Sequence, residues 1–263
     1  MIFFRAGAYL RYLMYSGHRN GHGIHSPFVF DLVSRIFRNK MNKDIVLYIE
    51  KQRMKMISDT RVITLNDLGA GSVRKSKSET AKVSEIARYS SVSEKYCILL
   101  ANMAKEFGKP FIIELGTSLG ISSMYMALNS PDTIVHTIEG CSERAEIAAE
   151  NFNEARIENI ILHNGSFDVV LPKILDSGQA PGLIFIDGNH RKEPLLAYFG
   201  IIADRSDSRT VVVVDDISLS PEMMQAWQEI KVHSKVSVTI DIHRMGIVFF
   251  REGINSNHFV VRY

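Results

Sequence analysis

The stretch FIIELGTSLGISSMYMAL, residues 111–128, decides the fold of this sequence. Its first five residues form an apolar run typical of a buried strand, and residues 121–128 return to the spacing of a helix. Between them, Gly116 and Gly120 let the backbone turn tightly and approach a ligand closely. In an open parallel sheet, ligands bind outside the carboxyl ends of the strands, usually at the first strand. We therefore predict a cofactor loop at residues 114–120.

Apolar runs alternate with amphipathic stretches from about residue 93 onward. This alternation predicts a mostly parallel sheet that helices cover on both faces. Only residues 243–245 separate the last two apolar runs, too few for a helical crossover, so these runs must form an antiparallel pair. The predicted fold class is α/β, a Rossmann-like, doubly wound, seven-stranded and mostly parallel sheet with an antiparallel last strand. The predicted strands are 111–115, 133–138, 158–163, 182–187, 210–215, 235–242 and 246–251.

A helical N-terminal extension precedes the sheet. The spacing of apolar residues predicts helices at 2–16, 25–37 and 44–58, the second with Ser26 as its N-cap and Pro27 at its first position. The region 61–92 is polar and rich in Lys and Ser, which indicates a connecting or lid segment. The predicted domains are residues 1–60 for the extension, 61–92 for this segment and 93–263 for the sheet domain.

The composition indicates a globular protein with one large core. The chain has 263 residues, 46% of them hydrophobic, and no apolar run long enough to span a membrane. Arg5 interrupts the apolar start and no cleavage pattern follows, so we expect no signal peptide. Cys97 and Cys141 cannot build a disulfide framework, which predicts a cytoplasmic location.

The charge is distributed unevenly along the chain. Residues 1–95 hold 17 Lys and Arg against 8 Asp and Glu, although the net charge of the whole chain is only +2. A basic region of this kind could face RNA, an acidic lipid surface or an anionic substrate. The simpler interpretation, which we favour, is that these charges lie on solvated helix faces.

An acidic residue follows the glycine loop at a suitable distance. Glu139 ends the second predicted strand, nineteen positions after Gly120, where a carboxylate can accept both hydroxyls of a ribose. A nicotinamide cofactor is the minor alternative, because Ser118 and Ser122 stand where such loops need glycine. The chain also contains no Tyr-x-x-x-Lys pair.

Five motifs follow one another on successive strand ends: ELGTSLG (114–120), TIEG (137–140), NGSFDVVLP (164–172), IFIDGNH (184–190) and VVVVDDI (211–217). In this order they resemble the class I S-adenosylmethionine-dependent methyltransferases, and most of all the small-molecule O-methyltransferase-like branch with its bacterial uncharacterised subgroup. The resemblance covers about residues 90–252 and implies S-adenosylmethionine as cofactor. It implies a methionine end lined by Glu114, Gly116, Thr117, Ser118 and Gly120, a ribose held by Glu139 beside Gly140, an adenine bordered by Gly165, Ser166 and Phe167, and a further cofactor contact from Asp187. Without the family, Phe167 would be assigned to the core.

Three carboxylates gather at the ends of two neighbouring predicted strands: Asp187, Asp215 and Asp216. Like charges repel at close range, and a divalent cation such as Mg²⁺ is the usual remedy. These positions match the metal-binding acids of the O-methyltransferase branch, although catechol-type members carry Asp-Asn where this chain has Asp215-Asp216. The alternative, given nearly equal weight, is that these acids cap a helix or bond backbone amides. Asp187 and His190 are the predicted catalytic residues, with His190 as general base or, alternatively, a structural hydrogen-bonding group.

The predicted function is methyl transfer from S-adenosylmethionine to an oxygen or nitrogen of a small-molecule acceptor, assisted by Mg²⁺. Two alternatives stay open: an RNA methyltransferase that uses the basic N-terminal third, and a non-catalytic module that binds the cofactor. The RNA alternative lacks an Asn-Pro-Pro-aromatic motif and paired catalytic cysteines, so we expect no nucleic-acid partner. A homodimer is left open.

A second glycine-containing stretch, NDLGAGSVRKS at 66–76, looks like a cofactor loop but does not meet the requirements of one. A P-loop would need glycine at position 74, where the chain has Arg74. No second strand ending in an acid follows at the required distance. We predict instead that residues 67–77 cover or select the acceptor.

Overall fold

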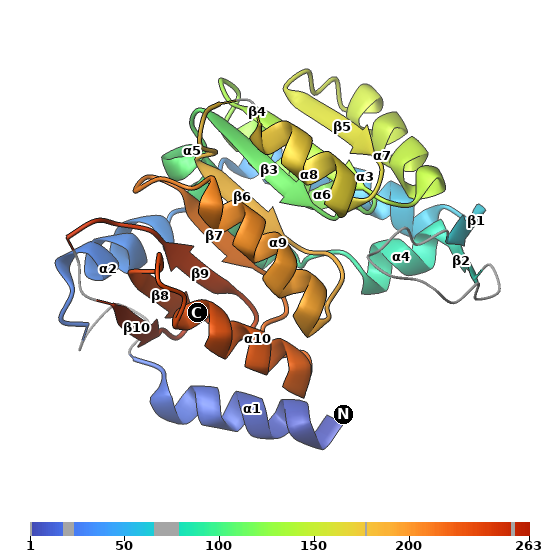
Figure 1. Ribbon diagram of the computed structural model, residues 1–263. Helices are drawn as coiled ribbons and strands as arrows, with labels where there is room; N and C mark the ends of the chain where they lie inside the picture. Colours follow the sequence, from blue (N-terminus) through green and yellow to red (C-terminus); the bar gives the residue numbers. More distant parts are fainter. Residues whose placement is uncertain (1, 18–23, 66–78, 177, 254–255) are drawn as a thin grey trace. The chain divides into compact units, whose positions relative to one another are not determined.

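The computed structural model describes residues 2–17, 24–65, 79–176, 178–253 and 256–263. The chain forms two compact units (Figure 1). Unit 1 combines Met1–Asn39 with Ala180–Tyr263, and unit 2 is Lys40–Gln179.

Unit 2 contains the strand predicted at residues 111–115. Its parallel strands run in the order β3-β4-β5, with Leu115 opposite Ile138 and Ile138 opposite His163. Figure 1 shows α8 on one face of these strands and α5 and α6 on the other. The strands are β3 (Phe111–Leu115), β4 (Ile134–Glu139) and β5 (Ile160–Asn164), and the helices are α5 (Glu94–Phe107), α6 (Ile121–Asn129), α7 (Ser142–Glu154) and α8 (Phe167–Leu175).

The N-terminal part of unit 2 packs against α7. It consists of α3 (Lys43–Ser58), the antiparallel hairpin of β1 (Val62–Leu65) and β2 (Glu79–Lys82), and α4 (Val83–Tyr89). The Thr64 N–H donates to Glu143 Oε2 at 2.8 Å, and Arg61 Nη1 lies 2.8 Å from Glu150 Oε2. The segment predicted as a connection thus contains a hairpin and a helix. Its glycine-containing stretch 66–76 lies outside the described residues.

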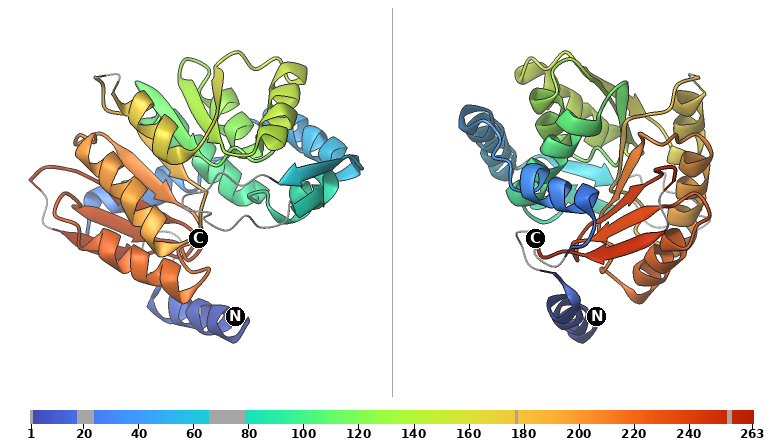
Figure 2. Two further views of the ribbon diagram at one scale, coloured as in Figure 1. Left: turned by 45° about the vertical axis from the view of Figure 1, so that its right-hand side comes forward. Right: turned by 90° about the vertical axis from the view of Figure 1, so that its left-hand side faces the viewer.

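Unit 1 holds five strands in the order β6-β7-β9-β8-β10. β6 and β7 are parallel, and β9 is antiparallel to both β7 and β8, as predicted for the pair at residues 235–251. Helices α9 and α10 lie on one face and α2 on the other (Figure 1, Figure 2). The strands are β6 (Leu183–Ile186), β7 (Val211–Val214), β8 (Val238–Asp241), β9 (Gly246–Phe249) and β10 (Asn257–Val260), and the helices are α2 (Pro27–Asp31), α9 (Lys192–Asp204) and α10 (Pro221–Lys231).

The first helix is attached to the C-terminal segment within unit 1. In α1 (Ile2–Tyr15), the Tyr12 hydroxyl donates to the Val261 carbonyl at 2.9 Å and accepts from the Tyr263 N–H at 2.9 Å. The π-helical turn η1 (Leu32–Ile36) continues α2, whose N-cap is Ser26 with Pro27 in its first turn. The three predicted N-terminal helices therefore form, but α1 and α2 belong to unit 1 and α3 to unit 2. The predicted boundaries at residues 60 and 92 do not coincide with this division.

Burial explains why the central strands read as continuous apolar runs. Every residue of β3, β6, β7 and β9 is buried, as expected of strands covered on both faces. The predicted α/β, Rossmann-like class is confirmed. The described residues add β10, which was not predicted, so β3–β5 and β6–β10 number eight strands instead of seven. Within the described part of the chain, no helix has the length and apolar character needed to cross a membrane.

Candidate cofactor loop and acidic rim

The glycine loop between β3 and α6 adopts a backbone that most residues avoid. Gly116, Ser118 and Gly120 have φ angles of 104°, 50° and 87°, all in the left-handed region. The Gly116 and Thr117 N–H groups donate to the Ile138 carbonyl at 3.0 and 3.2 Å, which attaches the loop to the end of β4. A Cβ atom on Gly120 would lie 2.4 Å from the ring of Phe152. The loop therefore needs glycine at position 120 for both its backbone and its packing.

Glu114 lies beneath this loop. Its side chain is fully buried, and its carboxylate accepts hydrogen bonds from Ser122 Oγ at 2.5 Å, from Ser123 Oγ and from Thr137 Oγ1 at 2.7 Å. Burial raises the pKa of Glu114 despite these three donors. The carboxyl group thus joins β3, the first turn of α6 and β4. This position is suited to shaping the loop from below, whereas the resemblance implied direct contact with the cofactor.

Glu139 occupies the end of β4 and contacts the loop directly. Its Oε2 accepts the Ser118 N–H at 2.8 Å, and its Oε1 accepts the Cys141 N–H at 3.0 Å. The Glu139 carbonyl accepts the Asn164 side-chain amide and the Gly165 N–H, both at 2.9 Å. Glu139 therefore connects the glycine loop with the ends of β4 and β5, and Gly140 follows it in the same turn.

Two buried polar atoms beside Glu139 have no hydrogen-bond partner among the described residues: Ser118 Oγ and Arg144 Nε. Ser118 bonds Glu139 through its backbone, and Arg144 Nη1 lies 4.0 Å from Glu139 Oε1. An unpaired buried polar group costs about 1–3 kcal/mol, so such groups call for an explanation. A ligand with hydroxyl and carboxylate groups would supply their partners. The residues at this loop therefore fit the polar groups of S-adenosylmethionine.

The segment predicted to border adenine begins α8. Ser166 is the N-cap of this helix, and a Cβ atom on Gly165 would lie 2.9 Å from Val170 Cγ2. Phe167, the first residue of α8, is half-buried. The ring of Phe167 therefore keeps some exposed surface at the N-terminus of α8, whereas the alternative assignment to the core would have buried it completely.

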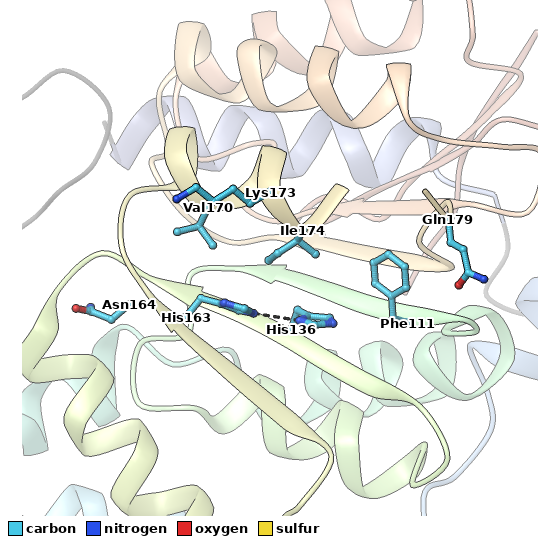
Figure 3. A pocket seen from close by; sticks show the side chains of 8 residues that line it. All are labelled: Phe111, His136, His163, Asn164, Val170, Lys173, Ile174 and Gln179. Atoms are coloured by element: carbon cyan, nitrogen blue, oxygen red, sulfur yellow. Dashed lines mark hydrogen bonds between the residues drawn. The ribbon is translucent and has the colours of Figure 1, made fainter. Parts of the chain in front are cut away.

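A cavity of about 590 Å³ lies between α8 and the sheet of unit 2 (Figure 3). On its floor, His136 Nδ1 and His163 Nε2 are 3.0 Å apart and share a hydrogen bond. Burial lowers the pKa of both imidazoles. This histidine pair was not predicted from the sequence, although β-strand alternation and the pairing of Ile138 with His163 place both imidazoles on one face of the sheet. The lining residues are Phe111, His136, His163, Asn164, Val170, Lys173, Ile174 and Gln179.

The three predicted metal-binding acids belong to unit 1, at the ends of β6 and β7. Asp215 is fully buried, and Arg244 holds both of its oxygens: Nε donates to Oδ1 at 2.9 Å and Nη2 to Oδ2 at 2.6 Å. Asp216 has a φ of 53°, and its Oδ1 lies 3.9 Å from Arg244 Nε. Burial and the adjacent Asp215 raise the pKa of Asp216. His190 Nε2 lies 3.7 Å from Asp187 Oδ1, slightly beyond hydrogen-bond distance.

These residues do not fit the predicted Mg²⁺ site. A metal ligand needs accessible oxygen lone pairs, and the guanidinium of Arg244 already neutralises and engages the carboxylate of Asp215. Among the residues that the structure describes, no three His, Cys, Asp or Glu side chains form a group that could hold a metal. The helix-cap alternative does not describe Asp215 or Asp216 either, because Ser220 is the N-cap of α10.

Residues 113–217 match the family model described as a methyltransferase domain. Among curated proteins, none matches this chain.

Several solved structures share the fold. The O-methyltransferase from Bacillus cereus, solved with S-adenosylhomocysteine, has a TM-score of 0.55 at 18% identity over 84% of this chain and 97% of its own. TomG from Streptomyces achromogenes, an O-methyltransferase of tomaymycin synthesis solved with S-adenosylmethionine, has a TM-score of 0.54 at 22% identity over 85% of this chain and 95% of its own. A putative caffeoyl-CoA O-methyltransferase from Staphylococcus aureus has a TM-score of 0.56 at 18% identity over 63% of this chain and 88% of its own.

Residues 113–217 thus match a methyltransferase domain, as the sequence motifs predicted, and the chain shares the fold of these solved structures. The prediction of an enzyme is confirmed with it. These three solved structures are described as O-methyltransferases, one of them as a putative one, and the sequence motifs resemble the same branch.

Proposed function

We propose that this protein transfers a methyl group from S-adenosylmethionine to an oxygen, or alternatively a nitrogen, of a small-molecule acceptor. The observation that carries the proposal is the carboxylate of Glu139, bonded to the backbone of the glycine loop, beside two polar atoms that find no partner in the described part of the chain. The methyltransferase-domain match covers this loop and the ends of β4, β5, β6 and β7.

The polar residues in and beside the loop would have separate tasks. Glu139 would accept the ribose hydroxyls, while Ser118 Oγ and Arg144 Nε would bind polar groups of the cofactor. Glu114 would maintain the loop conformation through Ser122 and Ser123. When bound, the cofactor supplies an activated methyl group, so the protein contributes mainly binding and orientation.

The residues for the acceptor are a separate part of the proposal. Asp187 and His190 stay predicted catalytic residues, with the His190 imidazole as the group that would take a proton from the acceptor. No step is assigned to Mg²⁺, because Arg244 engages Asp215. The small acceptor, a homodimer and a cytoplasmic location also remain predictions, as do the RNA and non-catalytic alternatives.

Calorimetric titration with S-adenosylhomocysteine tests the proposal. We expect Glu139→Gln to weaken binding about tenfold to a hundredfold, because charge-assisted hydrogen bonds contribute roughly 1.5–3 kcal/mol each. Glu158→Gln, at an exposed position of the same unit, is the matched control and should bind like the wild type. Absence of S-adenosylhomocysteine and S-adenosylmethionine binding by the folded wild-type protein would refute the proposed function.

A further inference from the structure

The ion pair between Asp215 and Arg244 in unit 1 is buried on the carboxylate side and bonded through two nitrogens of the guanidinium. The Asp215 side chain has no exposed surface, and the guanidinium meets it with two parallel hydrogen bonds of 2.9 and 2.6 Å. Fork-shaped pairs of this kind are the strong form of charge-assisted hydrogen bond. Removing one partner leaves an uncompensated buried charge, so the pair is costly to break.

The backbone holds Arg244 in place. It lies in the short connection between β8 and β9, where its N–H donates to the Ile242 carbonyl at 2.9 Å. Its own carbonyl accepts the Ile217 N–H at 3.0 Å, which ties this turn to the segment after Asp216. The neighbouring His243 has a φ of 71°, and its N–H donates to Asp241 Oδ1 at 2.7 Å. The guanidinium is therefore presented by a structured turn.

Arg244 faces all three acids that the sequence analysis assigned to a metal. It bonds Asp215, lies 3.9 Å from Asp216 Oδ1 and interacts electrostatically with Asp187. Burial alone would lower the pKa of Arg244, but Asp215, Asp216 and Asp187 together raise it, so the group is always charged. Other groups that act on Asp216 are His190 and Arg5, the latter from α1.

We propose that Arg244 is the permanent cation of this rim, and that Asp187, Asp215 and Asp216 bind no divalent metal. A metal would have to displace a buried guanidinium from both oxygens of its partner. The consequence for an acceptor is chemical: no metal lowers the pKa of its hydroxyl, so a side chain has to receive the proton. The charge assignment stands independently, whereas this consequence rests on the proposed function.

Titration of the metal-free, full-length protein with Mn²⁺, followed by electron paramagnetic resonance, tests the assignment. We expect the spectrum of free Mn²⁺ throughout, and the same melting temperature in Mg²⁺ as in KCl of equal ionic strength. Stoichiometric Mn²⁺ binding that Asp216→Asn abolishes would overturn the proposal.

Two variants of Arg244 sharpen the test. Arg244→Gln frees the carboxylate of Asp215, so it should melt at a lower temperature and gain Mn²⁺ binding. Arg244→Lys keeps the positive charge but loses the two-pronged hydrogen bonding, and it should still exclude Mn²⁺. This variant provides the test if Arg244→Gln does not fold. Arg209→Gln removes an exposed partner of Asp207 in the same unit and should change neither property. A folded Arg244→Gln protein that binds no Mn²⁺ would show that Arg244 is not the excluding group.

The two proposals fail separately. Loss of S-adenosylhomocysteine binding under every condition would refute the proposed function but leave the Mn²⁺ result valid. Methyl transfer that stops in EDTA and returns with Mg²⁺ would overturn the metal-free rim while confirming the function.

Discussion

Gly120 is the position at which the cofactor loop tolerates no side chain. Its φ of 87° lies in the left-handed region, and a Cβ atom there would lie 2.4 Å from Cε1 and 2.6 Å from Cζ of Phe152. This ring belongs to α7 and is itself buried, so moving it would disturb the packing between α7 and the loop. The substitution Gly120→Ala therefore carries both a backbone penalty and a steric penalty.

The two penalties can be added from their separate causes. A left-handed conformation costs a residue with a Cβ about 1–2 kcal/mol. Forcing an extra carbon into a packed site costs about 1–3 kcal/mol. We therefore expect Gly120→Ala to lower the free energy of unfolding by about 2–5 kcal/mol, a large part of the roughly 5–15 kcal/mol that stabilises most proteins. Binding of S-adenosylhomocysteine should weaken as well, because Ser118 lies in the same loop.

Urea unfolding followed by circular dichroism measures this cost, and two further variants separate its parts. Gly178 has nearly the same φ, 86°, but no atom of the described, non-adjacent residues lies within 4 Å of an added Cβ, so Gly178→Ala should cost only the backbone penalty of about 1–2 kcal/mol. In a Phe152→Ala background the steric penalty should vanish, and Gly120→Ala should then cost as little as Gly178→Ala. If Gly120→Ala costs no more than Gly178→Ala in the wild-type protein, the steric reasoning is wrong.

Two further changes should be measurable by the same unfolding assay. Tyr12→Phe removes hydrogen bonds to the Val261 carbonyl and from the Tyr263 N–H, which should cost about 1–3 kcal/mol, whereas Tyr9→Phe on the same helix should cost little; equal costs would contradict the role of the Tyr12 hydroxyl. Burial raises the pKa of Glu114, so the folded state keeps a proton that the unfolded state releases, and stability should fall as pH rises above the ordinary value of 4.5. Glu114→Gln should flatten this pH dependence, and an unchanged slope would refute the assignment.

Hydrophobic pattern predicted the central elements well because burial dictates their sequence. β3 begins and ends where the apolar run of residues 111–115 does, and the antiparallel relation of β8 and β9 followed from the shortness of their connection. The β1–β2 hairpin was missed, because thirteen residues separate strands that are each four residues long. β10 was missed for a related reason: Asn257–Val260 contains two polar residues and is only partly buried.

The role of a site residue could be predicted where it depends on neighbouring sequence. It could not be predicted where it depends on a hydrogen-bond donor that lies far away in the sequence. Glu139 follows Gly120 by nineteen positions, a sequence spacing that predicts a cofactor site. In the structure, the Ser118 N–H of the glycine loop donates to the Glu139 carboxylate at 2.8 Å. Arg244, in contrast, lies twenty-nine positions from Asp215 in a turn that carries no motif. Ser122, noted in the sequence only as a departure from glycine, is a hydroxyl donor to Glu114.

Glu114, Asp215 and Glu139 lie at or near strand ends, and each was predicted to bind a ligand. The groups that donate hydrogen bonds to the three carboxylates differ, and so do the roles that these acids can have. Glu114 receives three hydroxyl groups and is sealed, which suits a structural acid whose pKa is raised. Asp215 receives a guanidinium and is neutralised in place. Glu139 receives backbone N–H groups, while polar atoms of Ser118 and Arg144 beside it have no partner among the residues with a described structure. Since a buried donor without an acceptor is unfavourable, the surroundings of Glu139 are the ones that a ligand would stabilise.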